Sequence, residues 1–278
     1  MTFSAKPRKK FGQHWLKSEP ILAQIVAAAE LQASDRVLEI GPGTGVLTRR
    51  LVTQAQHVVA VELDYDLCRQ LMTQFAKTQN LLLLQGDILQ LDLAQQLTLA
   101  NDLPMPNKVV ANIPYYITGP ILERLLGTIA RPHPHPFDSI VLLVQREIAQ
   151  RLCARPGHKT FGGLTVKVQY LADCELICAV PPKAFQPPPK VDSAVIRLRP
   201  RPLATPANNP QRLQQLLKLG FGSKRKMLRN NLAAVIERAS LLELFATLDI
   251  ADNARAEDLS VADWVALSNK MLETPRVS

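Results

Sequence analysis

The stretch Val37-Leu-Glu-Ile-Gly-Pro-Gly-Thr-Gly-Val46 decides the fold, because it joins a strand-like run to a glycine-rich turn. An apolar run, Arg36–Ile40, enters the turn, and an amphipathic segment of helical length follows it. Glycine lets the backbone turn sharply and lie against a ligand without an intervening side chain. The spacing from Gly41 is G-x-G-x-G, not the G-x-G-x-x-G of dinucleotide enzymes. A tight structural turn uses the same residues, so the loop alone leaves the function open.

Outward from this loop, short apolar runs alternate with segments of helical length. This alternation predicts an α/β fold with a mainly parallel sheet covered on both faces by helices. Two later runs, Glu175–Val180 and Asp192–Leu198, have no clear helix between them and predict a hairpin at one edge of the sheet. The other expected strands are Arg36–Ile40, His57–Glu62, Leu81–Gly86, Lys108–Asn112 and Ser139–Gln145.

A proline-rich segment marks a domain boundary. Four prolines fall within the twelve residues Arg199–Pro210, which is typical of a linker. Beyond this segment the apolar residues recur at helical spacing. We therefore expect residues 1–202 to form the α/β domain, with a basic N-terminal segment, and residues 203–278 to form a small all-helical domain.

Composition excludes several classes of protein. The chain has 278 residues, of which 47% are hydrophobic and 21% charged, so disorder is not its main feature. The longest uninterrupted aliphatic run, Ile140–Val144, is far shorter than a membrane span, and no membrane partner is expected. The four cysteines form no C-x-x-C pair and have no histidine at zinc-finger spacing. We expect reduced thiols, no metal site and a cytoplasmic protein.

The excess positive charge is concentrated in one stretch. The formal net charge is +9, and residues 193–236 contain nine cations and no acidic residue. A solvated face normally mixes both signs, whereas this one does not, so we expect it to contact phosphates. The nine cations are Arg197, Arg199, Arg201, Arg212, Lys218, Lys224, Arg225, Lys226 and Arg229.

Acidic residues end the next two predicted strands. Glu62 lies 21 residues after Gly41, at a place where a carboxylate can accept hydrogen bonds from both ribose hydroxyls of an adenosine. Asp87 follows the third strand and can accept the adenine amine, while Ile88 packs on the ring. Each acid alone also suits a turn or cap. Together with the glycine loop they favour an S-adenosylmethionine site over a nicotinamide site.

The fourth strand ends in Asn112-Ile-Pro-Tyr115, followed by Tyr116. This sequence suits methylation of an exocyclic amine, whose lone pair is delocalised into the base. The Asn112 side-chain oxygen and the carbonyl of residue 113 or 114 can accept its hydrogens, and Tyr115 can stack on the base. A rigid proline-rich loop, 180–191, is expected to hold Phe185 over the pocket mouth. A strand-ending turn and a plain proline-rich connection are the simpler alternatives.

These motifs resemble those of the ribosomal RNA adenine dimethylases. The opening Lys9-Lys-Phe-Gly-Gln-His-Trp-Leu16 and the late Phe221-Gly-Ser-Lys-Arg-Lys-Met-Leu-Arg229 resemble the small-subunit branch of that family. The resemblance implies a Rossmann-like class I methyltransferase sheet with a small all-helical C-terminal domain. It also implies transfer of methyl groups from S-adenosylmethionine to two adjacent adenosines in a hairpin loop near the 3′ end of small-subunit ribosomal RNA. The products are N6,N6-dimethyladenosines. A monomer that acts on the small ribosomal subunit is expected.

The resemblance also assigns roles to residues. The family usually has Asn where this chain has His14, whose ring or backbone is expected to reach the methionine part of the cofactor. A large-subunit adenine methyltransferase of the macrolide-resistance type and a mainly non-catalytic ribosome assembly factor remain the alternatives. The expected catalytic residues are Asn112, Pro114 and Tyr115; the cofactor residues are His14, Leu16, Gly41, Gly43, Glu62, Asp87, Ile88 and Asn112; the substrate residues are Tyr116, Phe185, Lys224, Arg225, Lys226 and Arg229.

Overall fold

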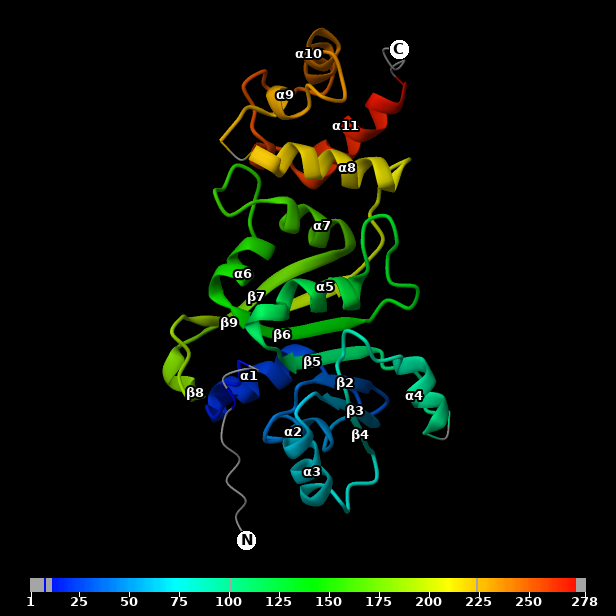
Figure 1. Cartoon of the computed structure of the whole chain (residues 1–278), viewed down its shortest axis with the longest axis vertical. Coiled ribbons are helices and arrows are strands. Elements are labelled where there is room, and N and C mark those ends of the chain that lie inside the picture. Colours follow the sequence, from blue (N-terminus) through cyan, green and yellow to red (C-terminus); the bar gives the residue numbers. More distant parts are fainter. Residues whose placement is uncertain (1–7, 9–11, 101, 224, 274–278) are drawn as a thin grey trace. The chain divides into compact units, whose positions relative to one another are not determined.

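The computed structural model describes residues 8, 12–100, 102–223 and 225–273. The chain forms two compact units (Figure 1). The first unit comprises residues 1–125, 135–149 and 174–200. The second unit comprises residues 126–134, 150–173 and 201–278.

The first unit is built on a seven-stranded sheet of order β4-β3-β2-β5-β6-β9-β7. The pairs from β4 through β6 are parallel, and β9 runs antiparallel to β6, which confirms the predicted α/β fold. The predicted edge pair also forms, since β9 and β7 are neighbours. The strands are β2 (Arg36–Ile40), β3 (His57–Glu62), β4 (Leu81–Gln85), β5 (Lys108–Asn112), β6 (Ser139–Gln145), β7 (Ala172–Val180) and β9 (Ser193–Pro200).

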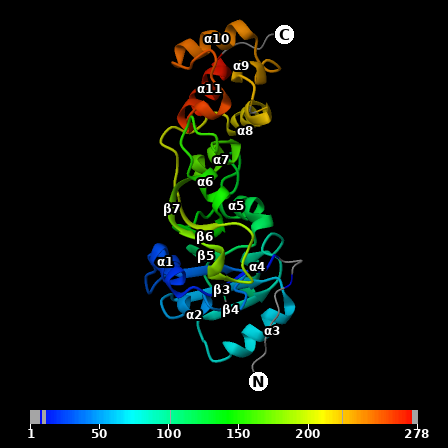
Figure 2. The same ribbon diagram turned by 90° about the vertical axis from the view of Figure 1, so that its left-hand side faces the viewer.

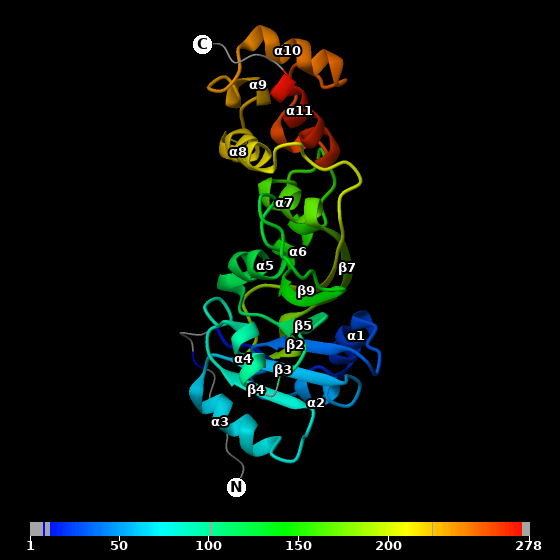
Figure 3. The same ribbon diagram turned by 90° about the vertical axis from the view of Figure 1, so that its right-hand side faces the viewer.

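Helices cover both faces of the sheet, as Figures 1 to 3 show for α1 and α4, which lie on opposite sides of it. One face packs α1 and α2 against strand residues such as Val37, Val58 and Val141 in a continuous apolar core. These strand residues are fully buried, as expected for the central strands of a parallel sheet. The helices of this unit are α1 (Glu19–Ala29), α2 (Thr48–Leu51), α3 (Tyr65–Gln74), α4 (Leu93–Leu99), α5 (Thr118–Leu126) and the start of α6 (Arg146–Leu152).

A short ribbon brings the N-terminal segment to the sheet. Strand β1 (Trp15–Leu16) pairs antiparallel with β8 (Phe185–Gln186). The backbone N–H of Lys17 also donates to the carbonyl of Ala184 at 2.8 Å. The paired residues, Trp15 with Gln186 and Leu16 with Phe185, are far apart in the chain and are thereby held side by side. The pairing places His14 next to the end of β5.

The second unit is helical and has its own core around Trp264, whose side chain is fully buried. Gly220 is required there, because a Cβ at this position would lie 2.4 Å from the Trp264 ring. Helix α11 begins as expected: Ser260 and Asp263 each accept a hydrogen bond from the other's backbone N–H. Its main helices are α7 (Gly163–Leu171), α8 (Pro210–Gly220), α9 (Leu228–Asn231), α10 (Arg238–Thr247) and α11 (Val261–Glu273).

The unit boundaries differ from the division expected at residue 202. Residues 126–134 and 150–173 belong to the helical unit, although the chain returns to the sheet after each of them. Ile129, Phe161 and Val166 pack into the core around Trp264 and explain this assignment. Among the described residues, no helix combines the length and apolar character needed to cross a bilayer.

Candidate active site

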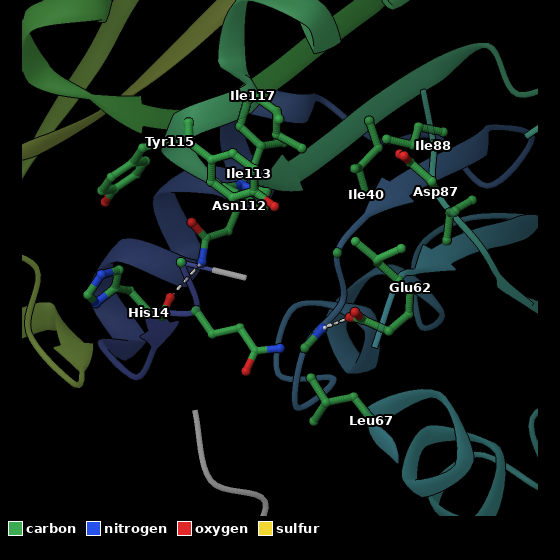
Figure 4. Close-up of a pocket in the computed structure, with 18 of the residues that line it drawn as sticks. His14, Ile40, Glu62, Leu67, Asp87, Ile88, Asn112, Ile113, Tyr115 and Ile117 are labelled. Carbon is green, nitrogen blue, oxygen red and sulfur yellow. Dashed lines mark hydrogen bonds between the residues drawn. The ribbon is translucent and has the colours of Figure 1, made fainter. Parts of the chain in front are cut away.

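A pocket of about 90 Å³ opens at the carboxyl ends of β2, β3, β4 and β5. Open α/β sheets bind their ligands at this edge. Figure 4 shows Asn112 and Tyr115 on one side of the pocket and Glu62, Asp87 and Ile88 on the other. The residues expected from the sequence that line it are His14, Gly41, Gly43, Glu62, Asp87, Ile88, Asn112, Pro114, Tyr115 and Tyr116.

The glycine loop after β2 forms the floor of this pocket and needs glycine at several positions. Gly41, Gly43 and Gly45 all have positive φ angles, between 60° and 77°. A Cβ on Gly43 would lie 3.3 Å from the Trp15 ring, and one on Gly45 would lie 2.7 Å from Phe75. The loop therefore presents bare backbone to the pocket and allows a ligand to approach it closely.

Glu62 is held rigidly at the end of β3. Its side chain is 5% exposed, and its two carboxylate oxygens accept the backbone N–H groups of Gly43 at 3.0 Å and Asp64 at 2.8 Å. Burial raises the pKa of this carboxyl above its ordinary value, and the neighbouring charge of Asp64 raises it further. Each oxygen keeps a second lone pair, so the carboxylate can still accept hydroxyl groups of a ligand.

Asp87 and Ile88 occupy the β4 end of the pocket. The Asp87 carboxylate accepts the backbone N–H of Leu89 at 2.9 Å and the side-chain amide of Gln90 at 3.2 Å. These bonds orient the carboxylate, as in an ordinary turn-capping aspartate. Ile88 is 6% exposed and lines the pocket with an apolar side chain. A flat apolar ring with a hydrogen-bond donor at its edge suits this pair.

Asn112, at the end of β5, is oriented by the N-terminal segment. Its amide nitrogen donates to the carbonyl of His14 at 3.2 Å (Figure 4). This bond uses one of the two N–H groups of the amide and orients the side chain, whose oxygen is the acceptor available to a ligand. His14 contributes its backbone here, while its ring Nδ1 bonds the carbonyl of Pro187 at 2.9 Å.

The aromatic residues after Asn112 differ in burial. The Tyr115 hydroxyl bonds Ser193 Oγ at 2.5 Å, and its ring stacks on His14 with centroids 6.2 Å apart. Burial raises the pKa of the Tyr115 phenol. Tyr116 is 60% exposed while lining the pocket, so it offers a free ring at the opening. Pro114 precedes them, and its carbonyl accepts the N–H of Ile117 at 3.3 Å.

Leu16 and Phe185, which were expected at the pocket, do not line it. Leu16 is 3% exposed and lines a smaller cavity of about 30 Å³ behind the glycine loop. Phe185 is 1% exposed and belongs to the apolar core, so in this structure its ring does not reach the pocket mouth as we expected. The reason is the β1–β8 pairing, in which Leu16 and Phe185 are direct partners and turn into the core.

The structure adds residues that the sequence did not single out. Gln13 and Trp15 line the main pocket, and the β1–β8 pairing that places them there has no local sequence signal. Glu39 lines the smaller cavity, is 1% exposed and has one carboxylate oxygen without a partner in the described residues. Burial raises its pKa to about 8. Its position inside the glycine motif was the only available hint.

The basic stretch does not form a single free surface. Arg197 and Arg199 are paired with Glu30 and Glu175, which come from distant parts of the sequence. Arg201 is likewise paired with Asp173. The expectation of an unneutralised stretch is therefore wrong for these three arginines.

The cationic residues near residue 225 that were expected to bind the substrate differ in exposure. Arg225 and Lys226 are exposed. Arg229 is half-buried and donates to the carbonyl of Asp252 at 3.1 Å. Lys224 lies outside the described residues.

The sheet, the glycine loop after β2 and the pocket at the strand ends define a Rossmann-like class I methyltransferase. More particularly, the chain belongs to the family of ribosomal RNA adenine dimethylases, whose family model matches residues 4–273. It is therefore an enzyme of the methyltransferase class.

Similar proteins carry related names. A protein of Nostoc punctiforme named ribosomal RNA small subunit methyltransferase A is 62% identical over 272 residues, covering 96% of this chain and 95% of the relative. The protein of the same name from Acaryochloris marina is 58% identical, covering 96% and 97%. A dimethyladenosine transferase from Plasmodium falciparum superposes with a TM-score of 0.77 at 28% identity, covering 91% and 96%. The 23S rRNA methyltransferase ErmE gives 0.72 at 27% identity, covering 94% and 100%.

Proposed function

We propose that this enzyme transfers methyl groups from S-adenosylmethionine to the N6 amines of two adjacent adenosines in small-subunit ribosomal RNA. The target is a hairpin loop near the 3′ end of that RNA, and the products are N6,N6-dimethyladenosines. The observation that carries the proposal is the orientation of Asn112. Its amide nitrogen is bonded to the His14 carbonyl, so its oxygen is the acceptor left for a substrate amine.

The pocket residues fit S-adenosylmethionine in their order along the sheet. Because the strands follow one another as β4-β3-β2-β5, Asp87, Glu62, the glycine loop and Asn112 follow in the same order. Asp87 and Ile88 would hold the adenine, Glu62 the ribose hydroxyls, and the glycine loop with His14 the methionine part. The bare backbone at Gly43, where a Cβ would contact Trp15, leaves room for this ligand. When bound, it supplies a methyl group on an activated sulfonium.

The protein's own residues act by alignment. The Asn112 oxygen accepts one hydrogen of the target amine, and a backbone carbonyl of residue 113 or 114 accepts the other. Together these two hydrogen bonds turn the nitrogen lone pair toward the methyl group of the cofactor. This alignment makes the methyl transfer effectively unimolecular. No general base is required, since the amine can lose its proton after the transfer.

The RNA would be held by stacking and by charge. The target base must leave its stack to reach the pocket, and the exposed ring of Tyr116 offsets part of that cost. Tyr115, fixed by Ser193, forms a second aromatic wall. Arg225 and Lys226 are exposed cations suited to phosphates. A cytoplasmic monomer that works on the small ribosomal subunit completes the proposal.

The large-subunit alternative is supported less well. The relatives that bear the small-subunit name are 58% and 62% identical to this chain, whereas ErmE is 27% identical. A purely non-catalytic assembly factor would not need an oriented amide and two carboxylates at adjoining strand ends. Binding to immature subunits and methylation can nevertheless occur in one protein.

The test is incubation of the protein with labelled S-adenosylmethionine and unmodified small subunits, followed by digestion and nucleoside analysis. We expect labelled N6,N6-dimethyladenosine at two adjacent positions. Large subunits and naked large-subunit RNA serve as parallel substrates. Label found only in large-subunit RNA, or the absence of any doubly methylated adenosine, would contradict the proposal.

A further inference from the structure

Arg8 ties the N-terminal segment to the far side of the pocket. Gly12 and Gln13 from this segment form part of one pocket wall. The guanidinium of Arg8 is paired with Asp64 at 3.3 Å and also with Asp66, both beyond the end of β3. The backbone N–H of Arg8 donates to the side-chain oxygen of Gln13 at 2.8 Å. One arginine thus contacts both the wall and the strand end opposite it.

Asp64 is the centre of this connection. Its side chain is 2% exposed and accepts the side-chain amide of Gln13 at 3.2 Å and the guanidinium of Arg8. It also accepts the N–H of Asp66, and so caps α3. Its own N–H donates to Glu62 at 2.8 Å. A continuous set of bonds therefore runs from Arg8 through Asp64 to Glu62, and from there to the glycine loop.

The charges favour an arginine at this place. Glu62 and Asp64 are two buried acidic residues close to the β3 end. A buried carboxylate such as Asp64 is costly unless it is paired. Arg8 is 42% exposed and keeps contact with water while its fork faces two carboxylates. It can therefore compensate the charge of Asp64 without being buried itself.

From this arrangement we infer that Arg8 is a positioning residue for cofactor binding, which holds the Gly12–Gln13 wall against the β3 end through Asp64. The wall is then in place before the ligand arrives, and the ligand does not have to order it. Arg8 does not line the pocket and so acts through Gln13 and Asp64. The inference rests on the proposed function, because it takes the ligand of this pocket to be S-adenosylmethionine.

The test compares the variants Arg8→Gln and Arg8→Lys with the wild type by calorimetric titration. The ligands are S-adenosylmethionine and its uncharged-sulfur product, S-adenosylhomocysteine. Arg8→Gln should raise the dissociation constant about fivefold, the upper end for a solvent-exposed ion pair. Both ligands should lose affinity equally, since Arg8 acts on the wall and not on the sulfonium. Arg8→Lys should be intermediate, because an ammonium cannot span two carboxylates as a guanidinium does.

Kinetics and salt separate positioning from a general loss of structure. We expect Arg8→Gln to raise KM for the cofactor and leave kcat unchanged at saturation. The difference in affinity from the wild type should shrink at high ionic strength. The thermal midpoint should stay within about 3 °C of the wild type. Arg69→Gln is the matched control, because Arg69 is an exposed arginine on helix α3, the helix that Asp64 caps.

The inference alone would be overturned by unchanged affinity in Arg8→Gln at low salt, by a lower kcat with an unchanged KM, or by an equal loss in Arg69→Gln. A loss confined to the charged ligand would also overturn it, since Arg8 would then act on the ligand's charge. A wild-type protein that binds neither ligand would overturn this inference together with the proposed function. The two failures are therefore distinguishable.

Discussion

The two ends of the central sheet differ in how buried acidic side chains are paired. At the amino ends of the strands, Lys108 pairs with Asp35 at 2.8 Å and donates to the carbonyls of Ala29 and Glu30, which end α1. At the carboxyl ends, Glu39 keeps an oxygen without a partner in the described residues. At the first end the polar groups close a helix, whereas at the second the buried Glu39 carboxyl lies beside the smaller cavity without full pairing among the described residues.

The pKa values follow this difference. Burial of Asp35 would raise its pKa, but hydrogen bonds from Lys108, from the Gln32 N–H and from Asn107 outweigh burial and lower it. Burial of Glu39 raises its pKa to about 8, since the polar groups of nearby Thr48 offset burial only in part and the charge of Glu62 raises the pKa further. A buried carboxylate thus adds to the stability of the fold at the amino end of the sheet and lowers that stability at the carboxyl end. Functional sites commonly carry such strain.

The largest effect should follow from a change at the carboxyl end that leaves the fold intact. Asn112→Ala removes the acceptor for the target amine while retaining the glycine loop, Glu62 and Asp87. Turnover should fall about 10³-fold, as for loss of one oriented polar group in an active site. Cofactor binding should be kept in part, since only the bond to His14 is lost. Methyl transfer and calorimetric titration measure the two effects; wild-type turnover would exclude the catalytic role of Asn112.

At the amino end, the expected effect falls on stability and not on catalysis. Lys108→Met should lower the free energy of unfolding by about 3 kcal/mol, because Asp35 becomes a buried charge without its partner. Cofactor affinity should be unchanged well below the unfolding transition. Denaturant unfolding measures the loss, and Lys108→Met combined with Asp35→Asn should recover part of it. A change in affinity without a change in stability would contradict the contrast between the two ends.

For Glu39, in contrast to Lys108, we expect a substitution to increase the stability of the protein. The carboxyl is protonated in the folded state up to a pKa of about 8, but ionises near its ordinary value when unfolded. Stability is therefore expected to fall as the pH rises from about 5 to 8, because the unfolded state loses its proton first. Glu39→Gln should remove this fall and stabilise the protein by about 2 kcal/mol at neutral pH. Thermal unfolding from pH 5 to 8 measures it; Asp35→Asn should destabilise in the same assay.

The smallest effect concerns the exposed cations Arg225 and Lys226 of the helical unit. The double variant Arg225→Gln and Lys226→Gln should weaken small-subunit binding and reduce the slope of log affinity against log salt by about 2, roughly one unit per lost phosphate contact. Arg199→Gln is the matched control, since Arg199 is already paired with Glu30. Binding measured between low and moderate salt compares them. Equal slopes for both variants would make Arg225 and Lys226 part of an ordinary solvated face.

Much of the site was predictable because its residues lie next to strong local signals. The glycine loop, Glu62, Asp87 and Asn112 each end a short apolar run, and parallel strands bring their ends to one edge. Phe185 was misjudged, since its burial depends on pairing with β1, a two-residue strand without a periodic pattern. The paired arginines were misjudged because their acidic partners lie far away in the sequence.

By itself the sequence determined the strands, the turn chemistry of the glycine loop and the identity of the groups at the strand ends. These depend on neighbouring residues and on short periodic patterns, which a linear chain carries in full. Only the tertiary structure decided which of these groups retain free hydrogen-bonding capacity, that Arg8 reaches Asp64, and that residues 150–173 join the helical unit. Burial and pairing depend on contacts between distant segments, and no local pattern encodes them.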